Sequence, residues 1–175
     1  MAEPIQIRRL SGGELHAHLD ELAAVLHDCV EGGASVGYLW PFTRDDARRA
    51  FEAFADEVDA GRRLLLGAFL ATDLVGTVQV VLAFPPNQPH RGEIARMLVR
   101  RTARRRGVAA QLLAAAEEEA RREGKTLLVL DAVSDGEAAR LYARLGWTTV
   151  GVVPGFALYP DGRPCDTTYF WKDIS

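Results

Sequence analysis

The chain has 175 residues, of which 48% are apolar and 26% are charged, and its formal net charge is -3. That length can bury a core of its own, and the composition is typical of a globular domain and excludes disordered and fibrous chains. The acidic balance argues against a nucleic-acid partner, because nucleic-acid binders usually carry a basic excess over the whole domain. We therefore expect residues 1–175 to form a single domain.

The sequence shows no targeting, membrane or metal-binding pattern. The first nine residues lack the apolar stretch of a secretory signal, and no later apolar run approaches the length of a membrane span. Cys29 and Cys165 match no metal-ligand spacing, and neither do the four histidines, so we expect two reduced thiols in or near a core. These features favour a cytoplasmic protein without a membrane partner or a metal ion.

Periodicity and turn residues predict an alternating series of strands and helices. Residues 5–10 alternate apolar and polar side chains, whereas apolar residues recur every three or four positions in the segments assigned to helices. In chain order the sequence predicts a strand at 5–10, helices at 11–29 and 43–61, strands at 64–70, 74–84 and 93–99, a helix at 107–123, a strand at 126–131, a helix at 135–145, and strands at 147–153 and 167–171. This order is typical of a mixed α/β or α+β fold built on one sheet.

Three details of this pattern are specific enough to compare with a structure. Asp135 is the predicted cap of the helix at 135–145. Glu117 and the two glutamates after it are expected on the solvated side of their helix. The strand at 93–99 loses its alternation at Met97-Leu98-Val99, which indicates either a β-bulge or burial on both faces.

A basic segment separates the strand at 93–99 from the helix at 107–123. It contains five arginines between positions 100 and 106, and Gly107 follows at the start of the helical pattern. Free backbone N–H groups at a helix start, a glycine and dense positive charge together favour the binding of an anion such as a pyrophosphate. A solvated basic turn is the alternative interpretation.

At this segment the chain resembles the GNAT superfamily of acetyl-CoA-dependent N-acetyltransferases. The pyrophosphate motif of that family, Arg/Gln-x-x-Gly-x-Gly/Ala, is matched by residues 104–109 (RRRGVA), and residues 141–147 (LYARLGW) are similar to its later Tyr-x-x-x-Gly-Phe pattern. The order of predicted elements agrees with this family over nearly the whole chain. The resemblance implies a mostly antiparallel, seven-stranded sheet with helices on both faces, acetyl-CoA as the donor, a small-molecule amine as the acceptor and a homodimer.

The resemblance also implies how the donor is held. Backbone N–H groups of the basic turn would hold the pyrophosphate, and the strand before it would run beside the pantetheine arm, with a bulge N–H facing the thioester oxygen. The implied cofactor-binding residues are Met97, Leu98, Val99, Arg104, Arg105, Arg106, Gly107, Val108 and Ala109. A buried strand with a purely structural role would show the same apolar run. Many family members place an asparagine near the start of the next helix, where this chain has Ser134-Asp135, so no donor contact is assigned there.

Three side chains match positions that carry out catalysis in the family. Glu93 is the implied general base that removes a proton from the amine, and Asp131, at the end of the neighbouring strand, is a second candidate base, a water relay or an anchor for the ammonium group. Tyr142 is the implied general acid, since a phenol can protonate a departing thiolate. The structural alternatives are an exposed strand position for Glu93, a turn residue for Asp131 and core packing for Tyr142.

Two segments outside the shared motifs bear on the acceptor. Residues 30–38 and 153–163 are similar to those of a family member that acetylates an amino-acid-like β-lactam toxin. The resemblance implies an acceptor pocket that includes Ser35, Tyr38 and Phe156, with core packing as the alternative for the two aromatic side chains. Other acceptors stay open, namely a polyamine, an aminoglycoside or a peptide amine, as do a non-catalytic acetyl-CoA sensor and a nucleic-acid module that uses the arginines.

Overall fold

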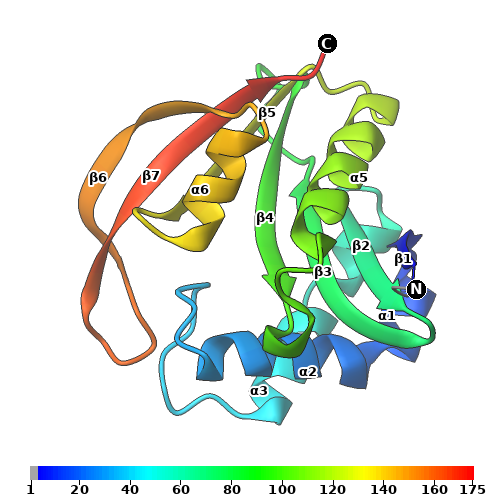
Figure 1. Cartoon of the computed structure of the whole chain (residues 1–175). Helices are drawn as coiled ribbons and strands as arrows, with labels where there is room; N and C mark the ends of the chain where they lie inside the picture. Colours follow the sequence, from blue (N-terminus) through cyan, green and yellow to red (C-terminus); the bar gives the residue numbers. More distant parts are fainter. Residues whose placement is uncertain (1–3) are drawn as a thin grey trace.

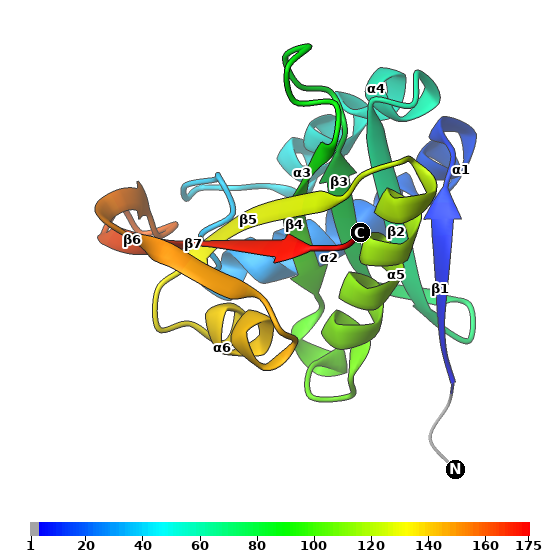
Figure 2. The ribbon, with the colours of Figure 1, turned by 90° about the horizontal axis from the view of Figure 1, so that it is seen from above.

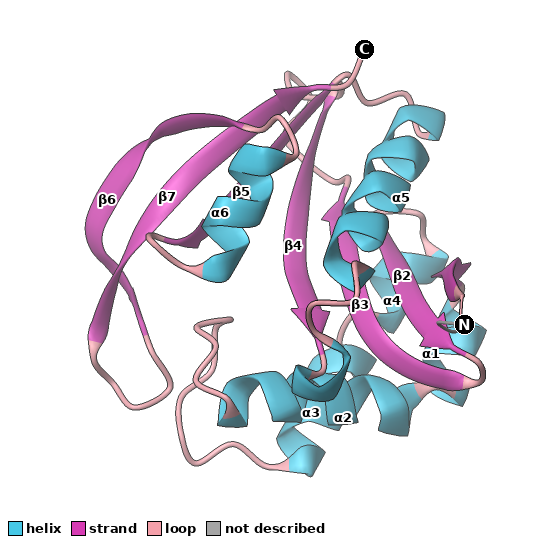
Figure 3. Ribbon diagram, viewed as in Figure 1, coloured by secondary structure: helices cyan, strands magenta, loops and turns pink. Residues whose placement is uncertain are grey.

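Seven strands form one sheet in the order β1-β2-β3-β4-β5-β7-β6 (Figures 1 and 3). The structure, a computed structural model, describes residues 4–175, so the first three residues of the predicted domain lie outside it. The elements are β1 (Ile5–Leu10), α1 (Gly12–Ala17), α2 (Leu19–Glu31), α3 (Arg44–Glu52), α4 (Ala55–Asp59), β2 (Arg63–Leu70), β3 (Asp73–Val81), β4 (Arg91–Val99), a 3₁₀ turn (Arg101–Ala103), α5 (Val108–Arg122), β5 (Leu127–Val133), α6 (Glu137–Arg144), β6 (Thr148–Leu158) and β7 (Pro164–Asp173). Each neighbouring pair is antiparallel except β4 and β5, which are parallel. The expected mixed, mostly antiparallel sheet is confirmed.

Both faces of the sheet are covered, because successive residues of a strand point to opposite faces. Leu64 and Leu66 of β2 pack into a cluster with α5, whereas Leu65 and Phe69 pack into a second cluster with α2 and α3. In Figure 2, α5 and α6 lie on one side of the sheet and α1, α3 and α4 on the other. None of the helices between residues 4 and 175 combines the length and apolar character that a membrane span requires.

Each of the two helices predicted near the N-terminus is divided in two. The helix predicted at 11–29 breaks at His18, whose φ of -104° and ψ of 15° are not helical, and the helix predicted at 43–61 breaks at Ala53 and Phe54. Because of the breaks, the short helices α1 and α4 contact each other, and α1 also contacts β1 while α4 contacts β2. The longer helix α2 crosses β3 and β4. The apolar spacing continues across each break, so periodicity does not reveal it.

The C-terminal hairpin is longer than the sequence predicts. β6 continues to Leu158, so residues 154–158 of the segment 154–162, which was expected to be a turn, belong to the strand. Its register with β7 shifts between Val153 and Ala157, and this irregularity absorbs the proline and glycine that suggested a turn. The connection between the two strands is therefore shorter than predicted, and the hairpin extends further from the core.

Two expectations for the second half of the chain are wrong. Gly136, not Asp135, precedes α6, and Asp135 adopts a left-handed conformation with a φ of 60°. Glu117 is buried rather than solvated, and its carboxylate accepts hydrogen bonds from Trp147 Nε1 (3.1 Å) and Lys172 Nζ (2.8 Å). Partners from the α6–β6 turn and from β7 thus compensate the burial of this charge, and the sequence of α5 alone does not indicate them.

The sheet divides between its two parallel strands. β4 and β5 pair only where residues 91–93 face residues 127–129, and beyond these pairs the two strands diverge (Figure 1). The register of β4 against β3 shifts between Thr77 and Gln79, and Arg96 has a positive φ of 47°. The bulge interpretation of this strand is therefore confirmed. The divergence and the bulge together shape the candidate site.

Candidate functional site

One edge of β4 lacks a partner strand beyond Glu93. Residues 94–99 form no ladder with β5 within the described chain, so the backbone N–H and C=O groups that point toward β5 are available to a ligand, except Val99 O, which accepts from Arg104 Nε (3.3 Å). The segment 97–99 implied in donor binding lies along this edge, with Leu98 buried and its two neighbours partly buried against the core. A ligand with an extended arm that carries amide groups can form hydrogen bonds along such an edge.

The basic turn presents backbone donors where β4 ends. Gly107 has a φ of 82°, a left-handed conformation that favours glycine, and Arg105 has a φ of 60°. Gln111 N donates to Gly107 O (3.1 Å) in the first turn of α5, and no side chain of residues 4–175 caps this helix. The amides from Val108 to Ala110 therefore keep N–H groups without intrahelical acceptors at the positive end of the helix dipole. These donors fit a pyrophosphate.

Only part of the arginine cluster is available to a ligand. Arg101 forms an ion pair with a carboxylate of α2 (2.9 Å), and Arg104 Nε donates to a backbone carbonyl at the end of β4 (3.3 Å). Arg106 is exposed, and the side chain of Arg105 is 90% exposed, with only a long ion pair (4.0 Å) to the exposed Glu137 of α6. Arg101 and Arg104 thus position the turn, while Arg105 and Arg106 extend from it.

Two carboxylates face the divergence from its two strands. Glu93 lies on β4, and Asp131 lies on β5, which continues to Val133, so Asp131 is not at the strand end as predicted. Burial raises the pKa of Glu93, and the nearby charge of Asp131 adds to this rise, while Arg91 (3.9 Å away) opposes it. Partial desolvation also raises the pKa of Asp131, although its side chain remains accessible. A raised pKa makes each carboxylate a stronger proton acceptor than an ordinary Glu or Asp side chain.

Tyr142 of α6 is only 4% exposed. Its ring packs against Trp147 (6.0 Å between centroids) and Phe170 (5.8 Å). Burial raises the pKa of the Tyr142 hydroxyl well above its ordinary value, and the negative charge of Asp131 adds to the effect. The ring therefore has the packing role that was weighed from the sequence, and the hydroxyl remains protonated near Asp131.

Tyr169 of β7 joins the site without having been predicted from the sequence. It pairs with Asp131 across β5 and β7, and its ring packs edge-on against Phe156 (5.7 Å between centroids, 86°). Burial raises the pKa of Tyr169, and the charges of Asp131 and Glu93 add to the rise. Only the register of β5 with β7 brings this tyrosine to the carboxylates, and no local motif carries that information.

The two segments implied in acceptor binding contact each other. Ser35 Oγ donates to Leu158 O (2.6 Å), and Trp40 N donates to Pro160 O (2.9 Å). These bonds fasten the loop after α2 to the β6–β7 hairpin, so the Ser35 hydroxyl is engaged in holding the loop. Phe156, on the same hairpin, is 50% exposed and keeps an accessible ring.

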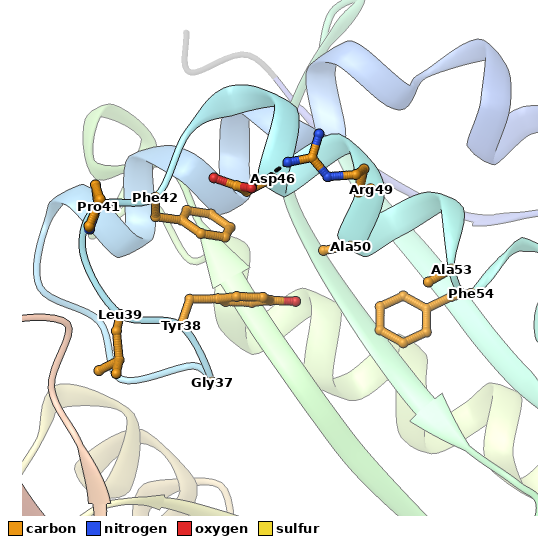
Figure 4. Close-up of a pocket in the computed structure, with 10 residues that line it drawn as sticks. All are labelled: Gly37, Tyr38, Leu39, Pro41, Phe42, Asp46, Arg49, Ala50, Ala53 and Phe54. Carbon is orange, nitrogen blue, oxygen red and sulfur yellow. Dashed lines mark hydrogen bonds and ion pairs between the residues drawn. The ribbon is translucent and has the colours of Figure 1, made fainter.

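An open pocket of about 690 Å³ lies beside this loop (Figure 4). It is lined by Gly37, Tyr38, Leu39, Pro41, Phe42, Asp46, Arg49, Ala50, Ala53 and Phe54. Tyr38 packs against Phe42 with 4.5 Å between ring centroids, and in Figure 4 its hydroxyl points along the pocket. Tyr38 thus lies in the pocket, while Ser35 and Phe156 are not among its lining residues.

Comparison with known proteins places this arrangement among acetyltransferases. The model of the Acetyltransferase (GNAT) family matches residues 21–147. The crystal structure of an N-acetyltransferase from Staphylococcus aureus Mu50 is similar, with a TM-score of 0.80 and 20% identity, covering 98% of this chain and 99% of that one. The matched segment contains the diverging strands, the basic turn and Tyr142.

Two further solved structures share the fold. The structure of yncA from Salmonella typhimurium, with its cofactor acetyl-CoA, has a TM-score of 0.79 and 19% identity, covering 98% of this chain and 94% of that one. Ribosomal-protein-alanine N-acetyltransferase from Brucella melitensis has a TM-score of 0.78 and 24% identity, covering 96% of this chain and 99% of that one. These identities are low, so the likeness concerns the fold and does not select an acceptor.

Proposed function

Because this chain belongs to the GNAT family of acetyltransferases and uses acetyl-CoA as its donor, we propose that it transfers the acetyl group to the nitrogen of a small-molecule amine. The observation that carries the proposal is that Asp131, on β5 beside the divergence from β4, lies within electrostatic range of both Glu93 and Tyr142. Carboxylates with raised pKa values beside a protonated phenol are typical of proton-transfer sites, and a domain that only binds the donor has no need of them.

The free backbone groups at the end of β4 support a donor site on this side of the sheet. The N–H groups of Gly107, Val108 and Ala109 would hold the pyrophosphate, and the exposed Arg105 and Arg106 would reach further phosphate oxygens. The unpaired edge at 97–99 would bond the amides of the pantetheine arm. Bound acetyl-CoA supplies the acetyl group as an activated thioester.

Proton transfer divides between residues on the two diverging strands and on α6. Glu93 accepts a proton from the ammonium form of the acceptor, and Asp131 attracts and orients the same group. A backbone N–H at the Arg96 bulge donates to the carbonyl oxygen on which negative charge develops. Tyr142 Oη holds the proton that the departing sulfur requires. Direct transfer depends on holding the donor and the amine together in this geometry.

We extend the proposal to an acceptor that is an amino-acid-like or β-lactam toxin, which makes the activity one of resistance. Residues 30–38 and 153–163 resemble segments of tabtoxin-resistance protein, a GNAT enzyme that acetylates tabtoxinine-β-lactam. The contact between these segments, from Ser35 to Leu158, supports a shared acceptor pocket that includes Tyr38. A polyamine, an aminoglycoside or a peptide amine would use the same chemistry.

The purified protein is expected to release free CoA thiol from acetyl-CoA only when a suitable amine is present. A panel of amino acids, amino-acid β-lactams, polyamines, aminoglycosides and peptides, followed by mass measurement of the product, identifies the acceptor and the acetylated nitrogen. A rise in Tm with acetyl-CoA but no acetylated product would favour the sensor instead. DNA binding that weakens as salt rises would point to the nucleic-acid module.

We further propose that the protein is a cytoplasmic homodimer. β6 is an edge strand whose large apolar side chains are exposed, among them Val150 (68%), Val152 (53%) and Leu158 (44%), and such an edge is usually covered by a partner. Cys29 and Cys165 are buried and unpaired, which suits a reducing compartment. Light scattering in solution should give twice the mass of the chain, whereas the mass of one chain at micromolar concentration would contradict the dimer.

A further inference from the structure

We propose that Arg96, together with the side-chain amide of Gln79, forms a subsite for an anionic group of the acceptor, with a carboxylate as the simplest case. The inference rests on the proposed function and narrows its acceptor to a small molecule that carries an amine and an anion a short distance apart. The inference follows from two polar groups on one face of the sheet, the Arg96 guanidinium and Gln79 Nε2, that have no partner within residues 4–175.

The Arg96 guanidinium is a partly buried cation without a counter-ion among the residues that the structure describes. It lies over the rings of Tyr38 (5.5 Å from the centroid) and Phe54 (4.6 Å), and both residues line the pocket in Figure 4. Burial lowers the pKa of Arg96, Arg63 adds to this effect and Tyr38 opposes it, and no carboxylate of residues 4–175 pairs with it. The two rings compensate part of the lost hydration, and an anion would compensate the rest.

Gln79 provides a second donor beside Arg96. Its side chain is fully buried, and its Oε1 accepts a hydrogen bond from Arg63 Nη1 (2.8 Å), while Arg63 is also paired with Glu57 (2.7 Å). The Nε2 of Gln79 has no partner in the part of the chain that the structure describes. Gln79 lies opposite Ala95 in the register of β3 with β4, next to the bulge. A buried N–H donor of this kind requires an acceptor, which a bound oxyanion would supply.

The candidate base lies on the same face of the sheet. Arg63, Val81 and Glu93 lie opposite one another on β2, β3 and β4, so their side chains point to one face. Gln79 is two residues from Val81 on β3 and therefore shares that face. The unpartnered amide and the proton acceptor are thus neighbours on a rigid sheet rather than on separate loops.

Arg91 lies 3.9 Å from Glu93, whereas two other arginines of this face gather at Phe54. The guanidinium groups of Arg63 and Arg96 lie over the same ring, that of Phe54, at 4.4 and 4.6 Å from its centroid. Glu93 and Asp131 face the divergence of the strands instead. An acceptor with both charges would therefore bind in one orientation, with its ammonium group toward the carboxylates and its anion toward Arg96.

Matched acceptors test this subsite, because an α-amino acid and its carboxamide differ in one charged group. The wild type is expected to prefer the acid by about 10- to 100-fold in kcat/KM. Arg96→Gln should lose this preference through a higher KM for the acid, with the amide little affected. Arg96→Lys should keep part of it, because lysine retains the charge but not the planar fork. Arg48→Gln, which removes a surface arginine paired with Asp20, should keep all of it.

Binding of unreactive probes separates this inference from the proposed function. N-acetyl amino acids carry the carboxylate but no reactive amine, so calorimetric titration into the CoA-saturated protein reports the subsite even if no amine is acetylated. We expect about tenfold tighter binding than to the N-acetyl amino-acid amides, and loss of that difference in Arg96→Gln. Binding without acetylation would contradict only the proposed function. Equal binding and reaction of acids and amides, or an unchanged preference in Arg96→Gln, would overturn the subsite and leave Arg96 a packing role.

Discussion

The Tyr142→Phe variant is expected to turn over its acceptor on the order of 100-fold more slowly than the wild type, with nearly unchanged affinity for acetyl-CoA. The phenylalanine ring keeps the contacts with Trp147 and Phe170, so only the hydroxyl proton is lost. Because burial and the charge of Asp131 both raise the pKa of Tyr142, the hydroxyl stays protonated over the working pH range. Wild-type activity should therefore show no decline near the ordinary pKa of a tyrosine.

Steady-state kinetics measures the loss of turnover, and calorimetric titration of acetyl-CoA measures whether the affinity for the donor is unchanged. Thr72→Val is the matched control, since it removes a hydroxyl from the exposed turn between β2 and β3. This control should keep wild-type turnover. The same Tm for wild type and Tyr142→Phe would show that the core is intact, and wild-type turnover in Tyr142→Phe would exclude the hydroxyl as the proton donor.

Glu93→Gln is expected to lower kcat/KM on the order of 100-fold near neutral pH and to remove the acidic limb of the pH–rate profile. A carboxylate acts as a base only when it is ionised, so wild-type activity falls as the pH falls through the raised pKa of Glu93. Glutamine does not titrate, and the remaining activity should depend less on pH.

The stability of the fold should change with pH in the direction opposite to the activity, so the free energy of unfolding should fall as the pH rises. Burial holds the pKa of Glu93 in the folded protein above its unfolded value, so between these two values the folded state binds more protons than the unfolded state. The free energy of unfolding therefore decreases as the pH rises through this interval. Glu93→Gln avoids the cost of ionising a buried carboxylate, so its Tm at neutral pH should equal or exceed that of the wild type.

Paired pH–rate profiles of Glu93→Gln and Asp131→Asn assign the base. The two carboxylates influence each other's titration, so the wild-type profile reports apparent pKa values of the pair. Loss of the acidic limb in Glu93→Gln alone identifies Glu93 as the proton acceptor, and the reverse result identifies Asp131. Unchanged profiles in both variants would assign the proton to another group. Glu118→Gln, on the exposed face of α5, serves as the charge control.

Local sequence pattern predicts much of the fold, because side-chain alternation marks a strand and the loss of that alternation marks a bulge. β1 has the bounds predicted for it, Ile5–Leu10, and the lost alternation at 97–99 predicted either a bulge or burial on both faces, of which the bulge is observed. Glu117 was misplaced because the groups that compensate its burial lie on β7 and on the turn before β6. Long-range partners of this kind leave no periodic signal in the helix that carries the buried residue.

In the candidate site, too, local motifs mark some of the residues, and strand pairing alone brings in the others. Glu93, Asp131 and Tyr142 were assigned through a family resemblance, which depends on short motifs along the chain. Tyr169 and Arg96 have no such motif, because their importance arises from strand pairing and from the absence of a partner in the folded chain. Unpartnered polar groups become visible only when every neighbour is known.

The bonds from Ser35 to Leu158 and from Trp40 to Pro160 have a consequence for how acceptor preference can change over generations. They join stretches of chain that are 123 residues apart at Ser35 and Leu158, so neither stretch keeps its anchor if the other is remodelled alone. A lineage that acquires a new acceptor must therefore substitute both stretches in concert. Because the Leu158, Trp40 and Pro160 groups in these bonds are backbone atoms, homologues that differ in acceptor should differ together in the length or backbone course of both stretches.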